Sequence, residues 1–168
     1  MRHECRNVDL DFFESAPTLH QASVQIQATP EDVFDAFLDA DAWVEWAMPI
    51  TGVDWTSDFP LEAGSTRTVH MRGGMVGYEE FLVFEHGRRM AFRFNEASKP
   101  IGAFAEDYQV TDLGGGRCEV QWTMAMDTGS ASGLRAKITD PIMGLMVRRM
   151  LRKFGRMVER RAKSGSPA

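Results

Sequence analysis

The sequence predicts an α+β fold in which a curved antiparallel sheet of about six or seven strands wraps around one long C-terminal helix. The helix is predicted from Pro141 to about Lys163, where apolar side chains recur with helical periodicity. The residues before it form short alternating segments separated by glycine-rich turns, which indicate strands. A helix of about 23 residues is roughly 35 Å long, and it needs a sheet to cover its apolar side. We therefore expect the helix to close over the concave face of the sheet around an apolar cavity.

The two sides of this helix differ in chemistry. At about 100° per residue, one arc carries Met143, Met146, Val147, Met150, Leu151, Phe154, Met157 and Val158. The opposite arc carries Arg148, Arg149, Arg152, Lys153, Arg156 and Arg160. Asp140 is the expected N-cap, because Pro141 then takes the first helical position.

The elements before the long helix follow in a clear order. Leu19 to Ala28 alternates between apolar and polar residues and predicts a half-buried strand. Thr29 is expected to cap a helix, and Asp41 a shorter one that carries Trp43 and Trp46. Further strands are expected at 53–55, 66–72, 75–84, 90–95, 102–111 and 117–126. Their short connections leave no room for crossover helices, so we expect a meander with two short helices after the first strand.

Length and composition favour one globular domain. The chain has 168 residues and a hydrophobic fraction of 43%, which is ordinary globular usage. No apolar run approaches the roughly 18 residues of a spanning helix, and the N-terminus lacks the apolar core of a signal peptide. We expect a cytoplasmic protein with an N-terminal arm at residues 1–17, a ligand-binding domain at 18–163 and a disordered tail at 164–168.

Charge is distributed unevenly along the chain. Residues 133–168 carry a net charge of +8, and the rest carries −13. One interpretation is a basic helix face for an acidic protein or an anionic membrane. The other is a solvated face attracted to an acidic body, which the overall net charge of −5 favours. No second basic patch supports nucleic-acid binding, so we expect no nucleic-acid partner and no stable membrane insertion.

The cysteines and histidines show no spacing typical of metal ligands. Cys5 and Cys118 form no framework, and the four histidines are scattered along the chain. We therefore expect no metal site and no cofactor.

Strand parity identifies side chains that should face the helix. Phe92 and Phe94 share one face of their strand, and Trp122 and Met124 share one face of theirs. Glu106 falls on the apolar face of its own strand, together with Tyr108. A buried carboxylate is costly unless it is paired or hydrogen-bonded, so Glu106 marks either a ligand-orienting polar group or a structural network.

The Gly73-Gly74 turn predicts a hairpin with a two-residue loop. That register pairs Arg67 with Glu80 and turns Val69 and Tyr78 inward. His70 then points to solvent, so we do not assign it as a catalytic base. The following turn agrees with this register only if it has three residues with Gly87 left-handed, or if a bulge occurs near Glu79 and Glu80.

Three stretches resemble a known family. Ala28-Thr29-Pro30-Glu31-Asp32-Val33-Phe34, then Trp43 and Trp46, then Gly64-Ser65-Thr66-Arg67, look like the polyketide cyclase/dehydrase branch of the START/helix-grip (SRPBCC) superfamily. The resemblance extends from about Leu19 to Lys163, and its motifs are structural rather than catalytic. It implies a hollow domain that holds a ligand.

Three functions follow as hypotheses. The first is a carrier or sensor of a small hydrophobic molecule such as a polyketide, lipid or isoprenoid. The second is a cyclase/aromatase-like enzyme with Glu106, Tyr108 and Arg67 as catalytic candidates. The third is an interaction module that uses the basic helix face. The expected cavity lining is Trp46, Arg67, Val69, Tyr78, Glu80, Phe92, Phe94, Glu106, Tyr108, Trp122, Met124, Met146, Met150 and Phe154.

Overall fold

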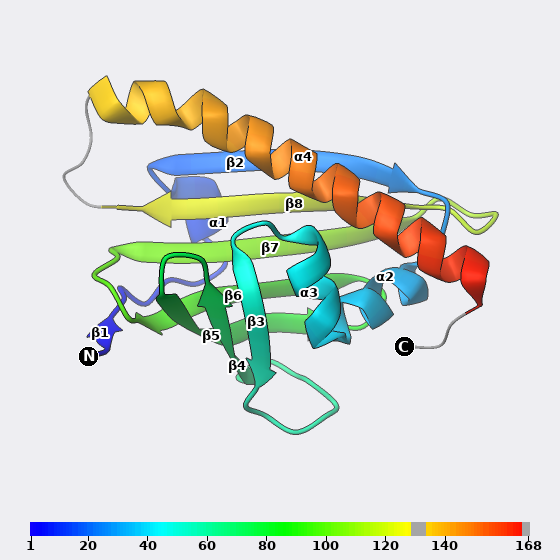
Figure 1. The fold of residues 1–168 in the computed structure, drawn as a ribbon, viewed down its shortest axis with the longest axis horizontal. Coiled ribbons are helices and arrows are strands. Elements are labelled where there is room, and N and C mark those ends of the chain that lie inside the picture. The colour runs from blue at the N-terminus through cyan, green and yellow to red at the C-terminus, as the bar shows by residue number, and fades with distance from the viewer. Residues whose placement is uncertain (129–133, 166–168) are drawn as a thin grey trace.

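The computed structural model describes residues 1–128 and 134–165, with the backbone alone for 134–140. Within these residues, seven antiparallel strands form a curved sheet in the order β2-β8-β7-β6-β5-β4-β3, and a short β1 pairs with β6 (Figure 1). The bounds are β1 (His3–Glu4), β2 (Thr18–Ile26), β3 (Ile50–Trp55), β4 (Thr66–Met71), β5 (Met75–Glu85), β6 (Arg89–Ala97), β7 (Ala103–Asp112) and β8 (Cys118–Asp127). The predicted meander is confirmed, with β2 added beside β8.

Three helices cover one face of this sheet. They are α2 (Pro30–Leu38), α3 (Ala40–Trp46) and α4 (Leu134–Ser164), and α4 lies along β2 (Figure 1). The apolar arc of α4 faces inward and is buried from Val147 onward, whereas its arginine arc is exposed. The α+β helix-grip architecture is therefore confirmed.

The caps of the two short helices come from local side chains. Thr29 and Asp32 form the reciprocal capping box of α2, with Asp32 N–H donating to Thr29 Oγ1 at 3.2 Å and Thr29 N–H to Asp32 Oδ2 at 2.9 Å. The predicted cap of α3 is wrong by two residues. Asp39 takes that role, because its Oδ1 accepts the N–H of Asp41 at 3.0 Å.

The long helix begins earlier than predicted. It starts at Leu134, so Pro141 lies inside it and Asp140 is not its N-cap. Proline removes one backbone hydrogen bond and crowds the preceding turn. The helix nevertheless continues on both sides of Pro141. Most of the predicted tail, residues 166–168, lies outside the described residues.

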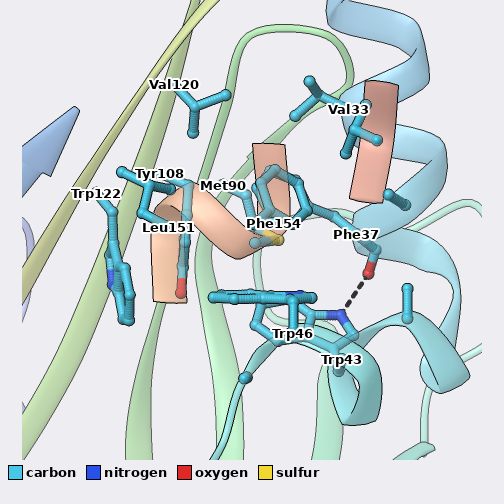
Figure 2. Packing of buried hydrophobic residues seen from close by; sticks show 14 of the residues in the cluster. Val33, Phe37, Trp43, Trp46, Met90, Tyr108, Val120, Trp122, Leu151 and Phe154 are labelled. Carbon is cyan, nitrogen blue, oxygen red and sulfur yellow. Dashed lines mark hydrogen bonds between the residues drawn. The ribbon is translucent and has the colours of Figure 1, made fainter. Parts of the chain in front are cut away.

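Aromatic rings fill the interior between α3, α4 and the sheet (Figure 2). Phe154 of α4 stacks on Phe37 with ring centroids 4.8 Å apart. Trp46 contacts Phe154 and Trp122, with centroid distances of 5.1 Å and 5.7 Å. The apolar cavity expected under the long helix is therefore absent between Phe154 and Trp122, because Trp46 from α3 lies between them.

The β4–β5 hairpin differs from the predicted register by one residue. Its loop comprises residues 72–74, and the two glycines have positive φ values of 77° and 72°. Arg67 consequently pairs with Glu79 rather than Glu80. Since a shift of one residue moves a side chain to the opposite face, Tyr78 and Glu80 point outward, and their predicted inward placement is wrong.

The next turn has the three-residue form that we considered. Glu85 pairs with Arg89, and Gly87 between them has a φ of 77°. A register shift just after Phe81 then places this side chain opposite Phe92. Both rings are fully buried, and their centroids lie 5.6 Å apart.

The N-terminal arm covers the outer face of the sheet. Val8, which precedes α1 (Phe12–Ser15), and Phe12, the first residue of α1, form a small buried cluster with alanines of β7 and β8. Arg93 of β6 donates to the backbone carbonyl of Val8 at 2.7 Å. The arm therefore packs as part of the domain.

Replacing Phe154 by alanine should lower the free energy of unfolding by about 3–5 kcal/mol, because it leaves a large cavity in the core. Urea denaturation followed by tryptophan fluorescence measures this change. Ile142→Ala is the matched control on the same helix, because Ile142 is 58% exposed. A loss for Phe154→Ala as small as the control's, within about 0.5 kcal/mol, would contradict the packing of α4 on α2 and α3.

Candidate functional site

Four buried polar side chains cross the concave face of the sheet, and we call Arg67, Glu79, Glu106 and His20 the polar band. The strand pairing brings them together: Arg67 of β4 faces Glu79 of β5, and Met124 of β8 lies between Glu106 of β7 and His20 of β2. All four are buried. Since buried ionisable groups cluster at functional sites, the polar band is the candidate site.

The first half of the polar band is an ion pair. Arg67 Nε donates to Glu79 Oε2 at 2.5 Å, and the two side chains are 1% and 4% exposed. The guanidinium carbon lies 4.1 Å from the ring centroid of Trp43 and 4.5 Å from that of Phe92. Burial raises the pKa of Glu79, whereas the charge and hydrogen bond of Arg67 oppose that rise. The positive charge of Arg67 thus lies in an aromatic environment of low dielectric constant. Its electrostatic interaction with nearby charged groups is therefore stronger than it would be in water.

Glu106 is the group in the polar band that holds a proton. Burial, followed by the negative charge of Glu79, raises the pKa of Glu106 to about 8. The hydrogen bond that the Tyr108 hydroxyl donates to Oε2 at 2.9 Å acts in the opposite direction. Burial also raises the pKa of Tyr108 well above its ordinary value, so it remains a donor. Glu106 is therefore mostly protonated at neutral pH and can donate a proton.

Several hydrogen-bond donors in this interior have no protein acceptor. Among the described residues, nothing accepts a hydrogen bond from Nη1 or Nη2 of Arg67, or from the indole N–H of Trp46. Trp43, by contrast, donates to the carbonyl of Phe37 at 2.8 Å (Figure 2). An unsatisfied buried donor costs about 1–3 kcal/mol. These donors are therefore unsatisfied polar groups inside a packed aromatic interior.

The half of the polar band formed by Glu106 and His20 is slightly less buried than the half formed by Arg67 and Glu79. Glu106, Met124 and His20 lie next to one another and retain 8%, 5% and 7% exposure. The backbone of α4 passes over them, because a Cβ placed on Gly144 would lie 3.6 Å from Nδ1 of His20. Phe104, Met126 and Met143 are partly buried hydrophobic residues packed against this core, and we call these three side chains together with the buried Met124 the methionine patch.

The structure brings together most of the residues expected to line a cavity. Those in the filled interior are Trp46, Arg67, Val69, Phe92, Tyr108, Trp122 and Phe154. Glu106, Met124 and Met150 are buried with slight exposure, and Met146 is partly exposed on α4. Phe94 packs instead in a separate cluster with Cys5 and Ala97.

Two of the expected residues lie on the outer face. The guanidinium of Arg2 sits 3.8 Å from the ring centroid of Tyr78. Glu80 Oε2 accepts hydrogen bonds from Asn95 Nδ2 at 2.6 Å and from Arg93 Nη2 at 3.2 Å. The one-residue shift of the hairpin accounts for both positions.

Glu79 and His20 were missed from the sequence. With a three-residue hairpin loop, Glu79 rather than Glu80 is the partner of Arg67, and the sequence permits a loop of two or three residues. His20 could have been identified, because it shares the inward parity of Ala22 and Ile26 on β2. No group of three or more His, Cys, Asp or Glu side chains suited to a metal ion occurs within the described ranges.

Comparison with known proteins settles the family. Residues 19–163 match the family model described as polyketide cyclase / dehydrase and lipid transport. The chain belongs to this family. Its members include relatives close in sequence: the uncharacterized protein Rv2574 of Mycobacterium tuberculosis is 45% identical over 160 residues, covering 95% of each chain.

Solved structures agree with the helix-grip fold of the family. The Zhui aromatase/cyclase from Streptomyces sp. R1128 has a TM-score of 0.68 at 16% identity, covering 89% of this chain and 98% of its own. A START superfamily protein from Mycobacterium smegmatis has a TM-score of 0.65 at 10% identity, with coverages of 88% and 99%. At these identities the similarity shows the fold alone. None of the helices in the described part of the chain is long and apolar enough to cross a membrane.

Replacing Glu106 by glutamine should change how stability depends on pH. In the folded protein this carboxyl keeps its proton up to about pH 8, whereas its ordinary pKa is 4.5. Between those values the folded state binds more protons than the unfolded state, so this contribution to stability falls as pH rises, by at most about 1.4 kcal/mol per pH unit. Glu106→Gln lacks this loss.

Urea unfolding of both proteins across this pH range provides the measurement. The free energy of unfolding of Glu106→Gln should rise relative to the wild type as pH increases. Glu14→Gln, which removes an exposed carboxylate, is the control and should follow the wild type. Parallel pH profiles for Glu106→Gln and the wild type would show that Glu106 is ionised in the folded protein.

Proposed function

We propose that this polyketide cyclase/dehydrase-family protein binds a small hydrophobic molecule that carries a hydrogen-bonding oxygen, as a carrier or sensor. The observation that carries this proposal is the position of the polar band directly beside the methionine patch. An apolar surface with a few buried polar groups is the usual composition of a small-molecule site. Membership of a family described by cyclase, dehydrase and lipid transport activities supports the same reading.

The methionine patch supplies the apolar half of the proposed site. Methionine is flexible and polarisable, and it adapts to ligands of different shape. The three methionines come from two elements, Met124 and Met126 from β8 and Met143 from α4, which lies along the neighbouring strand β2. A ligand at this place would cover Met126 and Met143, which are otherwise only partly buried.

The polar band supplies the orienting half. Protonated Glu106 offers both an O–H donor and a carbonyl acceptor. The buried charge of Arg67 favours a ligand oxygen that carries partial or full negative charge. A carbonyl, hydroxyl or enol oxygen would therefore point toward the polar band, while the hydrocarbon part rests on the methionine patch.

Filling the methionine patch should weaken binding. Met143→Trp places a large ring over the patch, and we expect at least a tenfold weaker affinity for a probe such as 1-naphthol, measured by isothermal titration calorimetry. Ile142→Trp adds the same ring to an exposed position of α4 and should leave affinity unchanged. Equal affinities of the two variants would exclude the patch as the binding surface.

The oxygen requirement is tested with naphthalene, which matches the apolar body of 1-naphthol. A site with buried polar groups rejects an analogue that lacks their partner, so naphthalene should bind about tenfold more weakly or worse. Native mass spectrometry of the purified protein would show the size of any molecule that it retains. No affinity for either probe, together with no retained molecule, would rule out the carrier proposal.

A second candidate function is proton-transfer catalysis on a polyketide-like substrate. The raised pKa of Glu106 favours it, because a carboxyl that is protonated near neutral pH can act as a general acid. In a dehydration, the Glu106 proton would go to the leaving hydroxyl group and release water. The resulting carboxylate would then take the proton from the adjacent carbon, which restores the acid.

Turnover of short β-hydroxy-carbonyl substrates tests this second candidate. Glu106→Gln should lower kcat by roughly 10²–10⁴ with little change in substrate affinity. Activity should also fall above about pH 8, where Glu106 loses its proton. Full turnover by Glu106→Gln would exclude Glu106 as the general acid. No turnover by the wild type of any substrate that it binds would leave the protein as a binder only.

A further inference from the structure

A second feature lies on the outer side of α4, away from the proposed ligand site. Arg148, Arg152 and Arg156 recur every four residues and form an exposed row. No acidic side chain in the described parts of the chain pairs with them. Arg160 and Arg161, on the same helix, are by contrast bound to Glu45 and Asp39 at 2.6 Å each. The arginine row is therefore not used to hold α4 to the domain.

The arginine row forms one wall of a groove along the edge of the sheet. Two adjoining hollows of about 480 and 200 Å³ share Arg152. We call them the edge groove. Apart from the arginines, its lining is Gln21, Ala22, Ser23, Val24, Gln25, Gln121, Gly155 and Glu159.

The other wall is the free edge of β2, the outermost strand of the sheet. Just beyond this strand, the backbone N–H of Gln27 donates to Glu159 Oε1 of α4 at 2.9 Å. Backbone groups of alternate residues point to the same side of an antiparallel strand, so those of Gln21, Ser23 and Gln25 point toward the groove as well. The contact with Glu159 shows that a carboxylate can satisfy an amide on this side of the strand.

We propose that the edge groove binds an acidic peptide segment in extended conformation, which adds to β2 as a further strand. Unpaired strand edges are recognised in this way by peptide-binding domains. The arginine row lies beside the added strand and favours acidic side chains, which the acidic body of the domain would otherwise repel.

The dimensions of the two walls agree with such a segment. From Gln21 to Gln25 the strand advances about 13 Å at about 3.3 Å per residue. From Arg148 to Arg156 the helix advances about 12 Å at about 1.5 Å per residue. In an extended peptide, acidic residues at every second position are about 6.6 Å apart, and the arginines are about 6 Å apart. The preferred sequence is therefore acidic at three alternate positions.

The groove favours a peptide over a membrane surface. A bilayer is broad and flat, whereas these arginines stand beside a concave strip with backbone donors and acceptors along it. The polar side chains on the strand wall, Gln21, Ser23 and Gln25, also suit hydrogen bonding better than insertion into lipid.

Fluorescence anisotropy with a labelled Glu-Thr-Glu-Thr-Glu peptide tests the proposal on the full chain. Saturable binding that weakens with added salt is expected. Arg152→Glu, at the centre of the row, should weaken binding at least tenfold. Arg149→Glu makes the same charge change on an exposed residue that does not line the groove, and it should weaken binding less than threefold.

Two further peptides test pairing with the strand edge. One is methylated on the threonine amides and the other on the glutamate amides, and one of the two should lose binding because its amides face β2. Equal binding of all three peptides, equal effects of the two arginine variants, or no saturable binding would overturn the proposal. Displacement of the peptide by phosphatidylglycerol vesicles, with the same dependence on Arg152, would identify a membrane surface instead.

Discussion

A guanidinium charge inside an aromatic interior has to be neutralised locally, and Arg67 imposes this requirement on the residues around it. Glu79 takes one edge of the guanidinium, and the rings of Trp43 and Phe92 lie close to it. Two carboxyl groups near a single positive charge cannot both ionise easily in a buried site. Burial, followed by the nearby charge of Glu79, raises the pKa of Glu106 to about 8, so that the same interior contains a positive charge, a negative charge and a neutral acid. In the proposed functions, this combination would allow the polar band to orient a ligand oxygen and to transfer a proton.

The long helix α4 performs a different task on each of its sides. Its apolar side closes the interior through Leu151 and Phe154 and continues into the methionine patch. Close approach to the sheet is possible because a Cβ on Gly155 would lie only 3.4 Å from Ile26 of β2. The arginine row is thereby brought beside the edge strand. The proposed ligand site and the proposed peptide groove therefore lie on opposite sides of one helix and use different side chains.

Much of the fold was predictable because the relevant signals are local. The capping box at Thr29 and Asp32 involves residues three apart, and the inward positions of Glu106 and Tyr108 follow from strand parity. The hairpin at residues 72–74 was not predictable to one residue, since two adjacent glycines permit a loop of either length. That single residue decides whether Arg67 meets Glu79 or Glu80. The filled interior was missed for another reason, because it depends on the direction in which α3 aims Trp46.

The sequence alone determined the order of the elements, the core-facing side of most of them with β5 as the exception, and the burial of a positive and an acidic side chain in that core. These properties follow from the backbone geometry of one segment at a time. The tertiary structure decided which carboxylate neutralises Arg67, how much of the space under α4 remains open, and that the arginine row borders the free edge of β2. Each of these depends on contacts between segments far apart in the chain, whose register and approach no local pattern encodes.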